Sequence, residues 1–525
     1  MVRLGLIPLD ERPCNEQYPR LVGKIAGACV VTPPQHMLSS KREVGDFHLL
    51  ENWLASVAGE LDGLIVSLET LVYGGLIPSR ISNDSLDDCL RRLDVLRRVK
   101  EQYPNLAIYA FNIVMRVSNS NINEEEPLYW SEYGKKIWLY SRLQYRVEFL
   151  GMTEEKEQLD AVRAEIPDHV LNDYLTRRAR NHQVNLAAVD LAADGTVDYL
   201  LFTQDDTSEF GFPNQEQHAL REKISRLGLE DRALVYPGAD EVGMVLVARH
   251  LNRIYNKRPR FFTRYSSVRG PLITALYEDR PLAESVKGQV FGSGGLVVDA
   301  PQDADIILML NTPGESQGEA PLQALVRTVD TSARNLPEFV SAMGYYKDRG
   351  YIVACADVAY ANGADLKLVP LLKRSIPLER LDGYAAWNTA GNTLGTVVAH
   401  ATARFLAREL DLGLESEAAH LEFLLLRFAD DWAYQAVVRT QIGTEFLPKH
   451  GVPYFQLGDS WELVQQEAAE RLTAVMNQFC SDTILGKRLP SGCTVKGVRF
   501  KNIHLPWKRM FEVGLDVEVE TETND

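Results

Sequence analysis

The chain repeats one pattern of hydrophobic and polar positions: a short apolar run, a polar stretch, and then apolar positions at helical spacing. The apolar runs are rich in branched and aromatic side chains, which is typical of buried strands. Strands that alternate with helices in this way form a parallel sheet. We therefore predict an α/β fold, with strands at 4–9, 29–32, 63–68, 106–111, 199–204, 233–236, 306–310, 351–356 and 384–387.

Nearly every predicted strand ends in a side chain that can hydrogen-bond a polyol or carry a proton. A closed (β/α) barrel directs all its loops to one pocket, so we favour a barrel-like parallel sheet with a single site. The alternative is two Rossmann-like halves that meet near Arg258-Pro259, with the site in the cleft between them. In either arrangement we expect one concave site to be lined by Asp10, Glu69, Asn112, Asp205, Asp240, Asn311, Asp357 and Asn388.

The pattern predicts a catalytic α/β domain over residues 1–410 and a helical C-terminal extension over 411–525 that ends in a strand pair. Between about 121 and 190 the alternation is interrupted, and we expect a helical insertion that could cover the site. Its run Glu124-Glu125-Glu126 is interpreted as a solvated loop.

The most informative stretch is Tyr199–Gly211, an apolar run that stops at the adjacent carboxylates Asp205 and Asp206. Either residue could cap the following helix. Two neighbouring carboxylates repel each other when both are ionised in a dry pocket, which can raise one pKa as acid–base catalysis requires. We therefore favour a functional pair. The next strand also ends in adjacent acidic residues, Asp240 and Glu241.

Net charge and motifs restrict the partners. A formal net charge of -16 disfavours nucleic acid and anionic membranes, and a small neutral or cationic substrate fits it better. The six cysteines are scattered, and no secretory or membrane-spanning segment is evident, so we expect a cytoplasmic protein with reduced thiols. The sequence lacks GxxxxGK[ST], HExxH and GxSxG, and we expect neither a cofactor nor a dedicated metal site.

Five segments of the chain carry a resemblance to a known family. They are Leu9–Pro13, Tyr73–Gly75, Phe202–Thr207, Gly238–Glu241 and Trp387–Asn392. With these segments the whole chain resembles an uncharacterised bacterial family of similar length, a domain of unknown function. The resemblance implies no activity.

Residues 199–240 also resemble the catalytic stretch of O-GlcNAc hydrolase and related hexosaminidase barrels, in which a strand ends in paired aspartates. This local resemblance implies that Asp205 orients the substrate's acetamido group and that Asp206 is the general acid. It also implies that Trp387 and Asn388 form a late wall of the sugar pocket. Here the pair follows about the fifth strand rather than the fourth, and a long insertion precedes it.

Our leading hypothesis is a hexosaminidase-like glycoside hydrolase acting on a small saccharide or glycoside. Asp206 would be the acid, with Asp205, Asp240 or Glu241 in the second catalytic role. The expected substrate-binding residues are the remaining strand-end side chains together with Arg12, Tyr73, Arg116, Asn119, His182, Asn362, Trp387, Asn388 and Asn392.

Two alternatives belong to other classes. One is a magnesium- or manganese-dependent hydrolase of a phosphoester or amide, with Asp10, Asp205, Asp206, Asp240 and His182 as ligands. The other is a carbohydrate-binding protein without catalytic activity, which would use the same polar strand ends.

Overall fold

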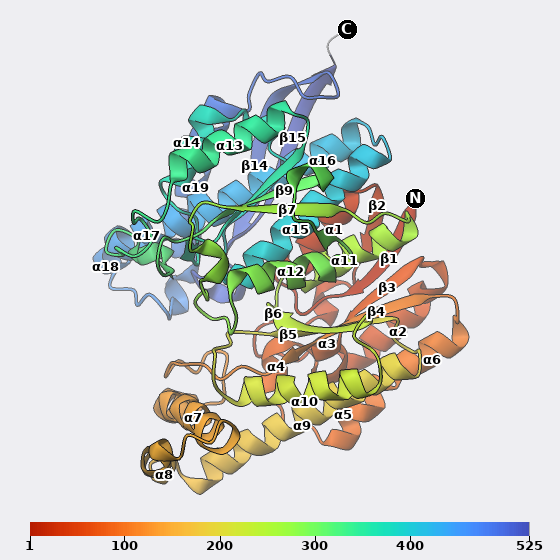
Figure 1. The fold of residues 1–525 in the computed structure, drawn as a ribbon, viewed down its shortest axis with the longest axis vertical. Coiled ribbons are helices and arrows are strands. Elements are labelled where there is room, and N and C mark those ends of the chain that lie inside the picture. The colour runs from red at the N-terminus through yellow and green to blue at the C-terminus, as the bar shows by residue number, and fades with distance from the viewer. Residues whose placement is uncertain (524–525) are drawn as a thin grey trace.

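The computed structural model describes residues 1–523, and its parallel strands form two sheets (Figure 1). The first sheet has six strands in the order β2-β1-β3-β4-β5-β6 and the second has five in the order β13-β11-β9-β7-β8. The first contains β1 (Val2–Ile7), β2 (Ala28–Val31), β3 (Gly63–Ser67), β4 (Ala107–Val114), β5 (Tyr199–Gln204) and β6 (Ala233–Pro237). The second contains β7 (Arg260–Tyr265), β8 (Leu296–Val297), β9 (Ile306–Asn311), β11 (Ile352–Asp357) and β13 (Gly383–Ala385).

Both sheets have the same doubly wound order. In each, the first strand along the chain lies between the second and the third, and the later strands follow on one side. The predicted α/β class and parallel pairing are confirmed. The division into two sheets matches the two-half arrangement that we kept as an alternative, and β7 starts beside the expected boundary at Arg258-Pro259.

Helices from both halves form the layer between the two sheets (Figure 1). Buried apolar residues of both halves belong to one continuous core there, which includes Leu246 and Val397. A second core covers the opposite face of the first sheet. The helices between the sheets are α1 (Pro13–Ile25), α11 (Val242–Ile254), α12 (Leu282–Gly292) and α15 (Ala390–Glu409), and those on the outer face of the first sheet include α3 (Leu68–Tyr73), α5 (Leu86–Leu93), α9 (Asp168–Ala193) and α10 (Phe212–Arg226).

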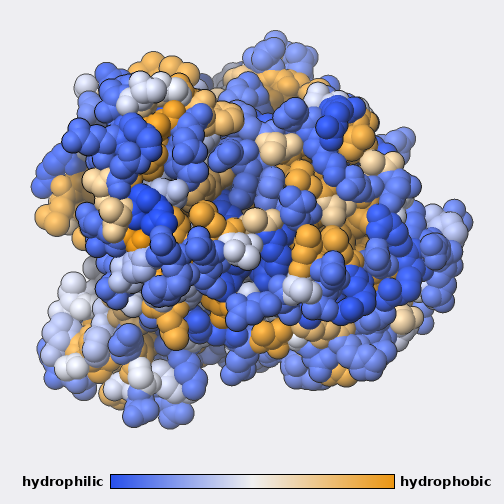
Figure 2. Space-filling model, turned by 90° about the horizontal axis from the view of Figure 1, so that it is seen from below, coloured by the Kyte–Doolittle hydropathy of each residue, from blue (hydrophilic) through white to orange (hydrophobic). Residues whose placement is uncertain are grey.

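The remaining helices complete the two halves. The first half also contains α2 (Phe47–Val57), α4 (Leu76–Ile81) and α6 (Val95–Gln102), and the second contains α13 (Leu336–Asp348) and α14 (Leu368–Ser375). A short parallel pair, β10 (Gly318–Glu319) with β12 (Tyr360–Ala361), lies outside the main sheets. The face seen from below in Figure 2 is largely hydrophilic, with small hydrophobic groups between the polar side chains.

The predicted insertion is helical. It consists of α7 (Trp130–Gln144), α8 (Lys156–Ala164) and the first part of α9, and it has a small core of its own that includes Trp130 and Tyr174. The long helix α9 then continues to Ala193 and packs on the first sheet. The later part of the insertion is therefore an ordinary helix that connects β4 to β5.

The C-terminal extension is also helical and ends in the predicted strand pair. After α16 (Leu414–Arg427) the helix widens into π-helical turns at Phe428–Val438 and Ile442–Phe446, on either side of α17 (Arg439–Gln441). The extension ends with α18 (Leu447–His450), α19 (Trp461–Thr483) and the antiparallel hairpin of β14 (Cys493–His504) and β15 (Gly514–Thr523).

Two properties concern the chain as a whole. None of the helices within residues 1–523 combines the length and the apolar character that a membrane crossing requires. All six cysteines are free thiols, as expected.

Candidate functional site

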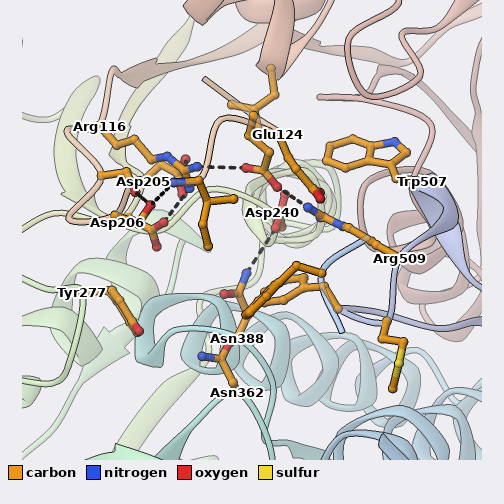
Figure 3. A pocket seen from close by; sticks show the side chains of 18 of the residues that line it. Arg116, Glu124, Asp205, Asp206, Asp240, Tyr277, Asn362, Asn388, Trp507 and Arg509 are labelled. Atoms are coloured by element: carbon orange, nitrogen blue, oxygen red, sulfur yellow. Dashed lines mark hydrogen bonds and ion pairs between the residues drawn. The ribbon is translucent and has the colours of Figure 1, made fainter. Parts of the chain in front are cut away.

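A pocket of about 260 Å³ lies where loops of both halves meet the turn of the C-terminal hairpin. Figure 3 shows Asp205, Asp206 and Arg116 on one wall and Trp507 with Arg509 on the opposite side. Its volume is just below the range of small-molecule sites. Arg12, Arg80, Arg116, Asp205, Asp206 and Asp240 come from the first half, Tyr277, Asn362 and Asn388 from the second, and Arg439, Tyr454, Phe455, Trp507 and Arg509 from the extension.

One wall is built around Arg12, which follows β1 in extended backbone just before Pro13 starts α1. Its Nη2 donates to Asp10 Oδ2 at 2.8 Å and to Asp240 Oδ1 at 2.6 Å. Asn15 bridges the same two carboxylates. Burial raises the pKa of Asp240 to about 6, although the charge of Arg12 opposes the rise. Asp10 thus supports Arg12 from behind the pocket and does not line it.

The paired aspartates form the opposite wall. Asp205 is ion-paired with Arg80, and Asp206 Oδ2 accepts a hydrogen bond of 2.6 Å from Arg116 Nη1. The Asp206 side chain is 30% exposed, compared with 14% for Asp205. Burial and the neighbouring Asp205 charge raise the pKa of Asp206 to about 7, against the opposing effect of Arg116. The pair therefore consists of a held carboxylate and a more accessible group that can carry a proton near neutral pH.

The glutamate run beside this wall is not solvated. Glu126 is 3% exposed and accepts from Arg116 Nε at 2.7 Å. Glu125 pairs with Arg80, Arg116 and Arg509. Burial acts to raise the pKa of Glu125, but the three guanidinium groups outweigh it and hold that pKa well below its usual range. The run is a loop, as predicted, but the prediction that it is solvated was wrong, because arginines from three segments of the chain converge on it.

Backbone strain is concentrated in the pocket. Ten non-glycine residues between 1 and 523 have positive φ, and five of these line the pocket. Asparagine and aspartate tolerate the left-handed region, but bulky aromatic residues rarely adopt it. Such strain clusters at ligand sites because the surrounding structure must hold it in place. The five residues are Asp206 (φ 40°), Tyr277 (67°), Asn362 (61°), Asn388 (55°) and Trp507 (55°).

The second half contributes amide and hydroxyl groups. Asn388 follows β13, and its Nδ2 donates to Asp240 Oδ2 at 3.3 Å across the boundary between the halves. Asn362 donates from its backbone N–H to Asn388 O at 2.9 Å and from Nδ2 to Glu319 at 2.7 Å. The Tyr277 hydroxyl also donates to Glu319. These bonds fix the polar lower wall seen in Figure 3.

Several predicted site residues support the pocket without lining it. Asn392 Oδ1 accepts from the Asp240 backbone N–H at 3.0 Å and so positions that residue. Trp387 is buried and packs edge-on against Tyr18. Asn119 lies in the loop whose neighbours Ser118 and Ser120 line the pocket.

Glu241 was expected in a catalytic role, but it points into the core. Its carboxylate accepts hydrogen bonds from the Ala239 backbone N–H at 2.8 Å and from Gln289 Nε2 at 2.7 Å, and the residue is fully buried. Burial raises the pKa of Glu241 to about 7. Adjacent residues at the start of a helix point in different directions, so only Asp240 reaches the pocket.

Other strand-end residues form separate polar clusters. Glu69 accepts from the Ile113 backbone N–H, and Asn112 is hydrogen-bonded to Asn185. Asn311 donates to Asp357 at 2.8 Å within the second sheet's own cluster. The predicted convergence therefore holds for Asp205, Asp240 and Asn388, with Asp10 directly behind them. It fails for Glu69 and Asn112, which are hydrogen-bonded inside the first half, and for Asn311 and Asp357, which are paired inside the second.

Two further candidates lie away from the pocket. Tyr73 is buried in α3 with the Arg180 guanidinium over its ring. His182 lies on α9, where burial and the charge of Arg178 lower its pKa to about 4. Neither residue is a pocket-lining group.

None of the residues by which the extension and the insertion line the pocket was predicted as a site residue. Arg80 follows the Tyr73-Gly74-Gly75 turn, which was a usable signal because glycines allow close approach. Trp507 and Arg509 lie in a hairpin turn about which the local pattern says nothing. The Trp507 ring lies under the Arg12 guanidinium at 4.4 Å, a contact between opposite ends of the chain.

The carboxylates of the pocket are held by arginines rather than grouped as ligands. Within residues 1–523, no group of three or more His, Cys, Asp or Glu side chains is placed to hold a metal ion. The arrangement can orient polar groups and transfer protons, and it places the protonatable Asp206 beside Asp205, which is ion-paired with Arg80.

Comparison with known proteins gives a family. A family model described as "Protein of unknown function (DUF4127)" matches residues 4–516. The chain matches no curated protein. The whole-chain resemblance is thereby confirmed, whereas the local resemblance to hexosaminidases stays a prediction.

Proposed function

The chain belongs to the DUF4127 family, for which no activity is described, and so we propose a function from the pocket itself: hydrolysis of a glycosidic bond in a small saccharide or glycoside. The observation that carries the proposal is Asp206, an accessible carboxyl group with a raised pKa beside a carboxylate that an arginine holds. Glycosidases need this combination of a proton donor and a second, ionised carboxylate.

Asp206 is the general acid. With its pKa raised to about 7, it is protonated in an appreciable fraction of molecules at neutral pH and can protonate the leaving oxygen. Its left-handed backbone and its bond to Arg116 fix the direction of proton transfer. The rate should therefore be highest below pH 7 and fall as the pH rises through 7, because the acid loses its proton.

Asp205 and Asp240 are the candidates for the second role. Asp205 is ion-paired with Arg80, and a carboxylate held in this way can orient a substrate group or stabilise an oxocarbenium-like centre. Asp240 lies on the wall held by Arg12 and is hydrogen-bonded by Asn388. The two carboxylates thus approach a bound ring from different walls.

The rest of the lining suits a sugar. Asn362, Asn388 and Tyr277 supply amide and hydroxyl groups that can hydrogen-bond to a polyol. Tyr454 and Phe455 supply aromatic rings against which the apolar face of a sugar can pack. Arginine pairing of the carboxylates supports acid–base chemistry over the metal-dependent alternative, because those oxygens already have cationic partners.

The proposal is tested with a panel of chromogenic aryl glycosides and the variant Asp206→Asn. On a cleaved glycoside, the variant should lose about 10²-fold or more in kcat, the usual contribution of a general acid. The loss should shrink when the leaving group is a strongly acidic phenol, because such a group departs without a proton. Circular dichroism and Tm check the folding of the variant.

Two outcomes would contradict the proposal. Near wild-type rates in Asp206→Asn on a glycoside that the protein cleaves would remove Asp206 as the acid. Activity that chelation abolishes, together with a stoichiometric ion in dialysed protein, would favour the metal-dependent hydrolase instead.

A further inference from the structure

One arginine of the pocket differs from the others in its partners. Arg12, Arg80, Arg116 and Arg509 are each neutralised by carboxylates that lie against them. Arg439 lines the same pocket and forms no ion pair with any residue in the described part of the chain. The other charged groups of the pocket pair with one another, except Glu124, which pairs with Lys41 outside the pocket.

The partners of Arg439 are neutral. Its Nε donates to the Tyr454 hydroxyl at 2.7 Å, and its Nη1 donates to Gln435 Oε1 at 2.7 Å and weakly to Phe511 O at 3.5 Å. Within residues 1–523, the hydrogen bonds of Arg439 come from Nε and Nη1, and none comes from Nη2. The residue is only 7% exposed, and a buried guanidinium without an anion is unfavourable.

The helix around Arg439 is shaped to hold this geometry. Arg439 starts α17, with π-helical turns directly before and after it. Such turns are rare and occur frequently at functional sites. Gln435, in the first π-helical segment, is itself fixed by bonds from its Nε2 to Asp430 Oδ1 and to Phe511 O, and its Oε1 orients the guanidinium.

We infer that the substrate carries an anionic group, a carboxylate, phosphate or sulfate, and that Arg439 binds this group through Nη2. The guanidinium is suited to such groups because its planar N–H donors match two oxygens at once. The substrate is then an acidic saccharide, in spite of the net charge of the whole chain, because the local charge at Arg439 is uncompensated. The inference deepens the proposed function and rests on it for the sugar and the reaction.

The first experiment measures the binding of anions in the absence of any sugar. Tm is measured with rising acetate, phosphate or sulfate against chloride at constant ionic strength, for the wild type, Arg439→Gln and Arg471→Gln. Arg471 lies on α19 of the same extension and pairs with Glu467 and Glu445 away from the pocket. At least one anion should raise Tm saturably in the wild type and in Arg471→Gln, and the rise should disappear in Arg439→Gln.

If the wild type gains nothing over chloride from any of the three anions, or if Arg439→Gln keeps the gain, the inference is overturned. Arg439→Lys serves where the Gln variant does not fold. It keeps the charge without the planar fork, so it should bind the same anion more weakly than the wild type and still above the chloride baseline. Affinity equal to that of the wild type would also contradict the role of the guanidinium.

The second experiment uses matched sugars that differ in one group. Calorimetry compares methyl glucuronides with methyl glucosides, and glucose 6-phosphate with glucose, which separates a carboxylate from a phosphate. The acidic member of a pair should bind at least about tenfold more tightly, and Arg439→Gln should remove the difference, as expected for a charged hydrogen bond. Equal binding in both pairs, or a preference that Arg439→Gln leaves intact, would overturn the inference.

The two proposals fail in different ways. Anion binding that depends on Arg439 without cleavage of any glycoside would leave this inference standing and remove the hydrolase. Cleavage of neutral glycosides at a rate that Arg439→Gln does not change would keep the hydrolase and remove the anionic substrate.

Discussion

At the residue scale, several residues of the pocket have a left-handed backbone conformation, which is unfavourable for residues with a Cβ atom. Asn388 has φ 55° and contributes a hydrogen bond to Asp240 and a backbone acceptor to Asn362. The left-handed conformation costs roughly 1–2 kcal/mol for a residue that has a Cβ but no polar side chain to hydrogen-bond to the nearby backbone. The surrounding contacts must therefore maintain the conformation, which gives the lower wall a single shape.

We predict that Asn388→Ala is less stable than Asn388→Gly by about 1 kcal/mol, measured by urea unfolding. Both variants lose the bond to Asp240, so the difference between them isolates the backbone. Equal stability of the two variants would show that the left-handed conformation relaxes on substitution and is not imposed by the fold.

The strand-end residues of the site could be predicted from the sequence, and the rest could not. Asp205 and Asp240 come directly after apolar runs, where a polar side chain at a strand end is a strong local signal. Glu125 and Arg509 have no such signal, because their position depends on how distant segments fold together. The direction of Glu241 into the core depends on where α11 begins, a boundary that a pattern cannot locate to one residue.

At the element scale, the turn between β14 and β15 forms one side of the pocket. Arg509 pairs with Glu125 of the insertion and donates to Glu512 at 2.7 Å, and Glu512 in turn lies 3.4 Å from Arg12. The guanidinium groups of Arg12 and Arg509 both lie over the Trp507 ring, at 4.4 and 4.5 Å from its centre. The turn is thus held by buried charges together with the apolar packing of Leu505, Met510 and Val513 in the core.

We expect Arg509→Gln to destabilise the protein by about 3 kcal/mol, because it removes one partner from buried ion pairs. Amide hydrogen exchange should accelerate in residues 505–513. Arg499→Gln is the matched control, since Arg499 lies on the same hairpin with its side chain 54% exposed and makes only surface ion pairs, which contribute little. Similar effects of the two substitutions would contradict the ordering role of Arg509.

At the scale of the whole molecule, the alternation of strands and helices was sufficient to predict the α/β class. Strands buried on both faces are continuous apolar runs, and those runs are visible in the sequence. The choice between one barrel and two sheets could not be made from the sequence, because β6 and β7 are consecutive strands and nothing in either run shows that they do not pair. Only the strand pairing in the structure shows that the two sheets have the same strand order.

Many carboxyl groups across both halves have raised pKa values because they are buried. Burial raises the pKa of Glu69 to about 8 and those of Asp357 and Asp431 to about 7 and about 8. Within residues 1–523, ten carboxyl groups have raised pKa values and outnumber the four histidines whose pKa burial lowers, so between pH 4 and 8 the folded state binds more protons than the unfolded state. A group with a raised folded pKa stabilises the fold below its unfolded pKa and loses that contribution as the pH rises through the folded value.

We predict that Tm falls as the pH rises from about 5 to 9 at constant ionic strength, because the folded state binds more protons than the unfolded state. Glu69→Gln should flatten the fall, because the amide oxygen can still accept from Ile113 while the group no longer titrates. A Tm that rises over this range, or an equally steep fall in the variant, would contradict the prediction.

The contact of Trp507 and Glu512 with Arg12 also has a consequence for synthesis of the protein. Translation proceeds from the N-terminus, so both halves with their sheets and shared helices can assemble while the last residues are still being added. During that interval Arg12 and Glu125 lack their C-terminal partners, and the pocket has no wall on that side. A chain that stops short of the hairpin turn has every strand of both sheets and still cannot form the site.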